Sequence, residues 1–297
     1  MKRIILVLIA IVSCTVSFAQ GSMEEYIEDL RKRVKKGDAE AMYFLGGMYR
    51  YENLGMTVML FQEAAQRGHP MAMKELGDFY FDGGIIDLKP NYEKAVEWYS
   101  KSAEKGNVEA MTILGKLYFK GEGVQQNNTY AIEWWKKAAE KGDILAMVNL
   151  GSIYYEIKKD YKMAFEWHNK AIEIGGFFDV VSKCYIGQMY YKGEGVQQNY
   201  QKAYEFFEAA EILGVAKGFL AEMNYYGYYI TKNYDKAYKL AKDGAEDKTN
   251  PSGTAMRILS ACYRYGMGGA PKDNEKAKYW LDESAKHKDE ISMRLLF

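Results

Sequence analysis

The sequence has few cysteines, few prolines, no excess of one charge and no long hydrophobic run beyond its first residues. Three cysteines in 297 residues exclude a fold that depends on a disulfide framework. Basic and acidic side chains number 40 each, so no positive field attracts DNA or RNA phosphates, and nucleic-acid binding lacks its main electrostatic contribution. Four prolines, and no bilayer-spanning apolar run after residue 13, favour a helical protein without transmembrane segments.

Hydrophobic and glycine residues, in contrast, are plentiful. The hydrophobic share of 48% and the charged share of 27% are typical of a folded chain rather than a disordered one. The chain also contains 28 glycines and 26 tyrosines. These high numbers of glycine and tyrosine indicate a structural feature that recurs along the sequence.

The N-terminus has the pattern of an export signal. Lys2 and Arg3 precede an apolar run over residues 4–12, and Ser17-Phe18-Ala19 provides small residues at the usual cleavage spacing. This pattern predicts a signal peptide over residues 1–19 and a mature chain in the periplasm or outside the cell. Cys14 ends a stretch that also fits a bacterial lipoprotein box, so an outer-membrane lipoprotein anchored at Cys14 is the alternative.

A repeat of 31 to 39 residues runs through the rest of the chain. The string Tyr118–Asn127 recurs at residues 190–199 with a single change, from Phe119 to Tyr191. The repeats begin at seven aligned positions: Ala41, Ala72, Ala110, Ala146, Ser182, Ala216 and Ala255.

Each repeat is predicted to form two helices. Ala110, Leu114 and Tyr118 lie on one helical face, and Gly115 beside them costs about 1 kcal/mol relative to alanine. Because this glycine recurs, we expect a bulky ring from the second helix to press on its bare backbone. Glycines eleven residues after the alanine of the second helix predict left-handed caps, at Gly106, Gly142, Gly175 and Gly214.

These residues resemble the Sel-one-like repeat family, a branch of the tetratricopeptide-like α/α solenoids. The family pattern of Ala-x3-Leu-Gly-x2-Tyr in the first helix and Lys-Ala-x2-Trp-Tyr in the second is matched most fully by the third and fifth repeats. The resemblance covers about residues 24–297 and implies an all-α superhelical solenoid that binds other proteins.

The predicted organisation is one solenoid domain over residues 20–297, with about seven repeats. Half-repeats at Tyr26–Gly37 and Ile291–Phe297 would cap its ends. Residues 156–160 are predicted to form a shortened inter-helix turn, and residues 243–254 an irregular connector. Cys184 and Cys262 are predicted to be buried and unpaired.

No catalytic or metal-binding pattern is supported, so no cofactor and no enzyme activity are predicted. The three histidines, His69, His168 and His287, share no ligand spacing. His168 occupies a ring-packing position of its repeat. Ser102 and Lys105 fit the Ser-x-x-Lys motif of serine β-lactamases, but the companion motifs are absent, and Ser102 aligns with a small packing residue.

The resemblance places a binding surface on the concave side of the first helices. Five residues after each repeat's Leu, or its equivalent, the sequence gives a column of two arginines and five aromatic residues, which are typical interface anchors: Arg50, Phe81, Phe119, Tyr155, Tyr191, Tyr225 and Arg264. Polar residues around the column would set its polarity: Lys116, Lys120, Glu156, Gln188, Lys192 and Arg257. Half-burial by neighbouring repeats is the competing interpretation of the column.

The predicted function is a non-enzymatic protein-protein interaction scaffold or adaptor in the bacterial cell envelope. Two alternatives stay open. One is a hydrolase or binder of β-lactam or peptidoglycan-related ligands, which would use Ser102. The other is a glycan-binding surface protein that uses the aromatic column as a stacking platform. The sequence does not identify the partner.

Overall fold

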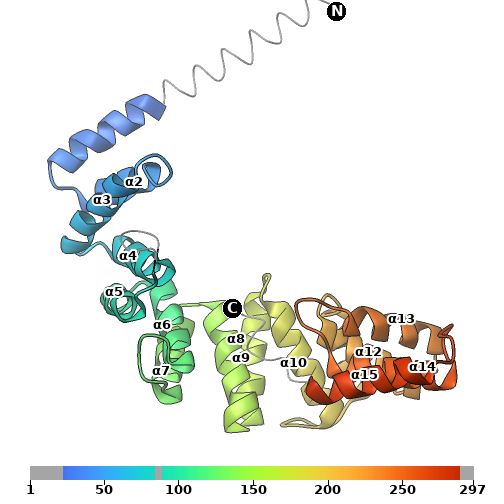
Figure 1. Ribbon diagram of the computed structural model, residues 1–297. Helices are drawn as coiled ribbons and strands as arrows, with labels where there is room; N and C mark the ends of the chain where they lie inside the picture. The colour runs from blue at the N-terminus through green and yellow to red at the C-terminus, as the bar shows by residue number, and fades with distance from the viewer. Residues whose placement is uncertain (1–22, 84–88, 288–297) are drawn as a thin grey trace, which may run out of the picture. The chain divides into compact units, whose positions relative to one another are not determined.

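The structure is a computed structural model that describes residues 23–83 and 89–287. Helices and the turns that join them make up these two ranges, and no strand occurs in them (Figure 1). The all-α class predicted from the sequence is confirmed. The predicted signal peptide (1–19), Cys14 and the half-repeat at Ile291–Phe297 lie outside the described residues.

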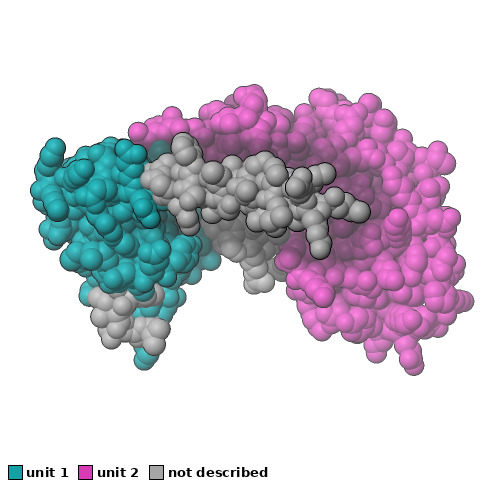
Figure 2. Space-filling model, turned by 90° about the horizontal axis from the view of Figure 1, so that it is seen from above, with its two compact units in different colours: residues 1–138 teal, residues 139–297 magenta. Residues whose placement is uncertain are grey.

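The chain divides into two compact units, residues 1–138 and residues 139–297 (Figure 2). One solenoid domain over residues 20–297 stays a prediction. The helices that begin in unit 1 are residues 23–35, α2 (Ala39–Met48), α3 (Leu54–Gln66), α4 (Pro70–Asp82), α5 (Tyr92–Glu104), α6 (Val108–Lys120) and α7 (Asn128–Glu140). Those of unit 2 are α8 (Ile144–Ile153), the π-helix η1 (Tyr154–Lys158), α9 (Tyr161–Ile174), α10 (Asp179–Lys192), α11 (Tyr200–Glu208), α12 (Gly214–Tyr226), α13 (Tyr234–Ala245), α14 (Gly253–Tyr265) and α15 (Asn274–Lys286).

Short polar side chains and glycines set the helix boundaries. At the start of α6, the Asn107 side chain accepts a 2.8 Å hydrogen bond from the backbone N–H of Ala110, which satisfies an otherwise unpaired donor. At its end, Gly121 adopts a left-handed conformation with φ of +74°, which a residue without Cβ adopts without strain. The predicted N-terminal half-repeat is the helix over residues 23–35, followed by Gly37 at φ +82°.

Rings from the second helices press on the mid-helix glycines of the first helices, as predicted. A Cβ at Gly77 would lie 2.6 Å from the Tyr99 ring, and one at Gly151 would lie 2.6 Å from Nε2 of His168. Real Cβ contacts are longer, so each ring occupies the space that a side chain would need. The same arrangement joins three further pairs: Gly46 with Phe61, Gly115 with Trp135 and Gly187 with Phe207.

The left-handed cap predicted at Gly214 is wrong. The second helix α11 ends early, at Glu208, and a turn over residues 209–213 leads into α12, whose first residue is Gly214. Gly214 has no positive φ, whereas the predicted caps Gly106, Gly142 and Gly175 do. Its missing side chain instead allows a close approach of the Asn250 carbonyl oxygen.

Two predicted irregular segments are more helical than expected. Residues 156–158, predicted as a turn, belong to the π-helix η1, and only Lys159 at φ +54° reverses the chain. The connector predicted over residues 243–254 is reduced to residues 246–252, because α13 continues to Ala245 and α14 begins at Gly253. Within the two described ranges, no helix is both long and apolar enough to span a bilayer.

Candidate partner-binding site

The seven residues of the predicted column lie at or just after the C-terminal ends of the first helices. Arg50, Phe81 and Phe119 belong to unit 1, and the other four belong to unit 2: Tyr155, Tyr191, Tyr225 and Arg264.

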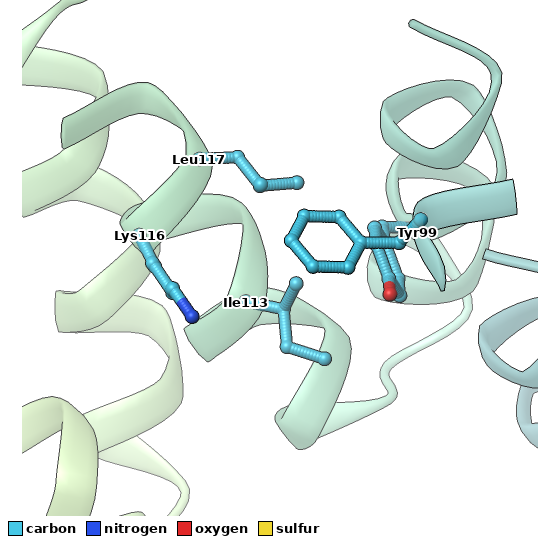
Figure 3. A pocket seen from close by; sticks show the side chains of 5 residues that line it. Tyr99, Ile113, Lys116 and Leu117 are labelled. Carbon is cyan, nitrogen blue, oxygen red and sulfur yellow. The ribbon is translucent and has the colours of Figure 1, made fainter. Parts of the chain in front are cut away.

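In unit 1, Phe81 lines a hollow of about 140 Å³. The other lining residues are Tyr99 of α5 and three residues of α6: Ile113, Lys116 and Leu117. Figure 3 shows these three side chains projecting from one helix toward the side on which Tyr99 lies. One predicted column residue therefore borders a cavity of side-chain size.

Ring packing closes the corresponding place in unit 2. Tyr191 has the position of Phe81 in its repeat, Phe207 that of Tyr99, and Phe219 that of Ile113. The ring centroids of Phe207 and Phe219 are 4.7 Å apart and nearly parallel, and Tyr191 lies 5.2 Å from Phe219. In unit 1, the smaller Ile113 stands where unit 2 has the Phe219 ring.

Two further column residues contact the residue of the next repeat that corresponds to Ile113. Arg50 forms a 2.5 Å ion pair with Glu75, and Tyr155 lies 5.2 Å, ring to ring, from Tyr185. Both Glu75 and Tyr185 stand two residues before the mid-helix glycine of their repeat, as Ile113 does. At the junction bordered by Phe81, the residue at this position, Ile113, lines the hollow.

The Tyr99 side chain, which lines the hollow, also contacts charged residues of α4. The Tyr99 hydroxyl donates a 2.8 Å hydrogen bond to Asp78, which also accepts from Lys74 at 2.9 Å. Burial disfavours the Lys74 ammonium, but its hydrogen bonds with Asp78 and Glu109 outweigh this, so the pKa of Lys74 is raised. Burial and the Asp78 carboxylate both raise the pKa of Tyr99, which keeps its proton.

Lys116 carries the only formal charge among the five lining residues. Burial lowers the pKa of its amine, and the nearby Lys120 lowers it further, while Glu122 opposes this. The Lys120 amine lies 3.9 Å from the Glu122 carboxylate. The hollow is therefore apolar apart from the Lys116 amine and the Tyr99 hydroxyl.

The remaining column residues differ in exposure. Tyr155 is buried, its hydroxyl donates to Glu194, and the Lys192 amine donates to the same hydroxyl at 3.2 Å. Its side chain therefore packs inside unit 2. Phe119 and Tyr225 are half-buried, and Arg264 is exposed.

The residues weighed for catalysis lie in packing roles. Ser102 is buried, and its hydroxyl donates a 2.7 Å hydrogen bond to the Pro70 carbonyl, while Lys105 is exposed. His69 caps α4 by accepting from the N–H of Ala72. In the described ranges, no group of three His, Cys, Asp or Glu side chains could hold a metal ion. Cys184 and Cys262 are buried and unpaired, as predicted.

His168 is fully buried against Gly151, as its ring-packing position predicted. Its Nδ1 lies 3.0 Å from the Ser182 hydroxyl, and its ring stacks on Tyr185 at 4.6 Å. Burial lowers the pKa of His168 to about 3, so the imidazole is neutral at physiological pH. His168 is therefore a core residue whose protonation is disfavoured by its burial in the fold.

Helix pairs in series, each with a ring packed on a glycine, define an α/α repeat protein of the scaffold type. A sequence model of the Sel1 repeat matches residues 39–69, 70–107, 108–143, 144–176, 181–215, 216–247 and 253–289. The chain therefore belongs to the Sel1 repeat family and contains seven such repeats.

Solved structures of this family are similar to the chain. A protective antigen of uropathogenic Escherichia coli with the SLR fold, c5321, is 31% identical over 88% of this chain, with a TM-score of 0.70, and the match covers 56% of the antigen. A Sel1 repeat protein of Oxalobacter formigenes is 30% identical over 83% of this chain and 97% of its own length, with a TM-score of 0.68. No curated protein matches the chain.

Phe81 was predicted from the sequence as a binding residue, but the hollow beside it was not. Tyr99, Ile113 and Leu117 were not proposed as binding residues, because their helical spacing predicts only core packing. A usable signal was present in the residue two before the mid-helix glycine, or before Ala221 and Ser260, which replace the glycine in the last two repeats. In the seven successive repeats this residue is Phe44, Glu75, Ile113, Asn149, Tyr185, Phe219 and Ile258. The aliphatic Ile113 faces a Phe81–Tyr99 ring pair, and only three-dimensional packing shows the space this leaves.

Proposed function

We propose that the chain is a non-enzymatic scaffold that binds a protein partner in the bacterial cell envelope, and that the hollow beside Phe81 receives an apolar side chain of this partner. Membership of the Sel1 repeat family supports a protein-binding role. The hollow carries the proposal of the site, because three apolar side chains and the Tyr99 ring line it, and burial of an apolar side chain there is favourable.

The test of the site fills the hollow with a ring that the fold already accepts in unit 2. Ile113→Phe copies the side chain of Phe219 at the corresponding position, and Ile113→Leu is the volume-matched control. Both variants and the parent chain would be used for crosslinking and affinity capture from the native envelope, with mass spectrometry to identify what they bind. We expect the Phe variant, but not the Leu variant, to lose the partner.

A partner that binds the Ile113→Phe chain as well as the parent would contradict this site. Phe81→Ala compared with Phe119→Ala provides an independent comparison, because both residues hold the same position of successive repeats and only Phe81 lines the hollow. We expect the first substitution to weaken capture more than the second.

The envelope location is a separate proposal that rests on the N-terminal pattern of residues 1–19. Cell fractionation with an antibody against unit 2 tests it. A shorter mature chain in the periplasm or medium supports cleavage after Ala19, whereas membrane association abolished by Cys14→Ser supports the lipoprotein alternative. A full-length chain in the cytoplasm contradicts both.

A further inference from the structure

The junction in unit 2 shows what kind of side chain fits the place that is hollow in unit 1. Phe219 corresponds to Ile113, and its ring lies nearly parallel to the Phe207 ring, with the ring centroids 4.7 Å apart. The Tyr191 ring lies 5.2 Å from the Phe219 ring, at an interplanar angle of 61°. Stacked and edge-to-face pairs are the arrangements that aromatic rings prefer. In unit 2, therefore, the chain itself supplies a ring that contacts two others.

The two rings that would receive such a group are also present in unit 1. Tyr99 stands at the position of Phe207, and Phe81 stands at that of Tyr191, and both line the hollow. Ile113 takes the place of the third ring and, like Phe81, is half-buried, whereas Tyr99 is buried. The hollow therefore has two aromatic walls, and part of its lining reaches the surface.

The size and polarity of the hollow also fit a phenyl ring. Its volume of about 140 Å³ is close to that of an engineered apolar cavity of about 150 Å³ that binds benzene. The polar groups of the lining are already engaged, because the Tyr99 hydroxyl donates to Asp78 and Lys116 has an interaction within the chain. A hydroxyl group carried into the hollow would lose its hydrogen bonds with water and gain none from these side chains.

We infer that the hollow of unit 1 receives the phenyl ring of a phenylalanine of the protein partner, in preference to an aliphatic or a hydroxylated side chain. The ring would contact the rings of Phe81 and Tyr99, as the Phe219 ring contacts its two neighbours in unit 2. This inference rests on the proposed function and adds the identity of the residue that anchors the partner.

The test compares peptides that differ in a single side chain. Three acetylated and amidated pentapeptides have the sequence Gly-Ser-X-Ser-Gly, in which X is phenylalanine, cyclohexylalanine or tyrosine. Binding to the full chain is followed by the NMR signal of the Ile113 δ-methyl group, assigned with Ile113→Leu, which reports filling of the hollow even at millimolar affinity. The dependence of the shift on peptide concentration gives the dissociation constant.

The phenylalanine peptide is expected to bind most tightly. Cyclohexylalanine has a similar size and is more apolar, so it would bind at least as tightly if burial alone determined the affinity. Contacts between aromatic rings instead favour phenylalanine, and we expect it to bind about two- to tenfold more tightly than cyclohexylalanine. The tyrosine peptide should bind at least about fivefold more weakly than the phenylalanine peptide, because its hydroxyl enters an apolar hollow.

The variant Phe81→Leu tests whether contacts between rings cause the preference for phenylalanine over cyclohexylalanine. It keeps an apolar side chain in the lining but removes one of the two aromatic walls, so we expect the preference to decrease at least about twofold. Phe177→Leu makes the same change at an exposed ring of unit 2 that does not line the hollow, and should leave the preference unchanged.

The outcomes separate this inference from the proposed function. If the parent chain binds the cyclohexylalanine or the tyrosine peptide as tightly as the phenylalanine peptide, the inference is overturned but the proposed hollow stays intact. A preference that Phe81→Leu leaves unchanged would overturn it in the same way. If none of the three peptides shifts the Ile113 signal at millimolar concentration, the proposed function is contradicted as well.

Discussion

Trp135 lies against the bare backbone of Gly115, and its indole N–H donates a 3.1 Å hydrogen bond to the Thr112 carbonyl one turn earlier. The ring thus occupies the place of a missing side chain and also satisfies its own polar group, although it is fully buried. This arrangement links the two helices of a repeat through a contact that any side chain at position 115 would obstruct.

The adjacent glycines of α2 test this packing with a matched pair. A Cβ at Gly46 would lie 2.8 Å from the buried Phe61 ring, whereas a Cβ at Gly47 meets nothing within 4 Å. We expect Gly46→Ala to lower the free energy of unfolding by about 1–3 kcal/mol, because the ring must move. Gly47→Ala should raise it by up to about 1 kcal/mol, because alanine favours the helix.

Urea denaturation followed by circular dichroism measures both changes. Since the two positions are neighbours in one helix, the difference in helix propensity is the same for both. Equal effects of the two substitutions would show that the Phe61 contact does not matter for stability.

The ring–glycine contacts were predictable from the sequence because both partners recur at fixed helical spacing. A mid-helix glycine such as Gly151 recurs in the first five repeats at a cost in helix propensity, and His168 stands at the position of the compensating ring. The end of α11 was not predictable in the same way. There the glycine spacing predicted a cap at Gly214, but the close approach of the 246–252 segment uses that glycine in a helix start instead.

The hollow depends on side-chain sizes from three helices, which spacing within one helix does not reveal. Phe81 could be selected from its position, but whether its neighbourhood is filled depends on residues of α5 and α6 together. The same limitation applies to Tyr155, whose position predicts a surface ring. The π-helical end of the first helix instead buries this side chain beside Glu194.

His168 makes the stability of unit 2 depend on pH. Its pKa is about 3 in the folded chain and about 6.5 when unfolded. Between these values the unfolded chain binds a proton that the folded chain does not, so stability is fully present above pH 6.5 and falls as the pH decreases toward 3. The expected loss is about 1.4 kcal/mol per pH unit within this window.

The variant His168→Phe isolates this contribution, since Phe207 holds the same position in the next repeat. Unfolding free energies of both chains would be measured in urea between pH 7 and pH 5. As the pH decreases from 7 to 5, the free energy of unfolding should fall more for the parent than for His168→Phe. The contribution of the carboxylates is common to both chains and cancels in this comparison. A constant difference would mean that His168 does not titrate between the two states.

Tyr155 and Tyr225 should respond differently to loss of their hydroxyl groups. Tyr155 is buried and hydrogen-bonded to Glu194 and Lys192, so Tyr155→Phe should lower the free energy of unfolding by about 1 kcal/mol. Tyr225 is half-buried and packs mainly against other rings, so Tyr225→Phe should be nearly neutral. Thermal unfolding of the two variants measures this, and an equal effect would contradict a structural role for the Tyr155 hydroxyl.

Exchanging the residues at positions 113 and 219 tests why one junction is open and the other is closed. Phe219→Ile removes a buried ring that packs on Tyr191 and Phe207, and should lower the free energy of unfolding by about 1–3 kcal/mol. Ile113→Phe adds a ring where about 140 Å³ is already available, so it should change stability by less than about 1 kcal/mol in either direction. Urea denaturation at one pH compares the two variants with the parent chain.

A loss of more than about 2 kcal/mol in Ile113→Phe would mean that α6 and α5 cannot accommodate the ring. Failure of that variant to capture the partner would then no longer identify the hollow as the site, whereas a stable variant that loses the partner would.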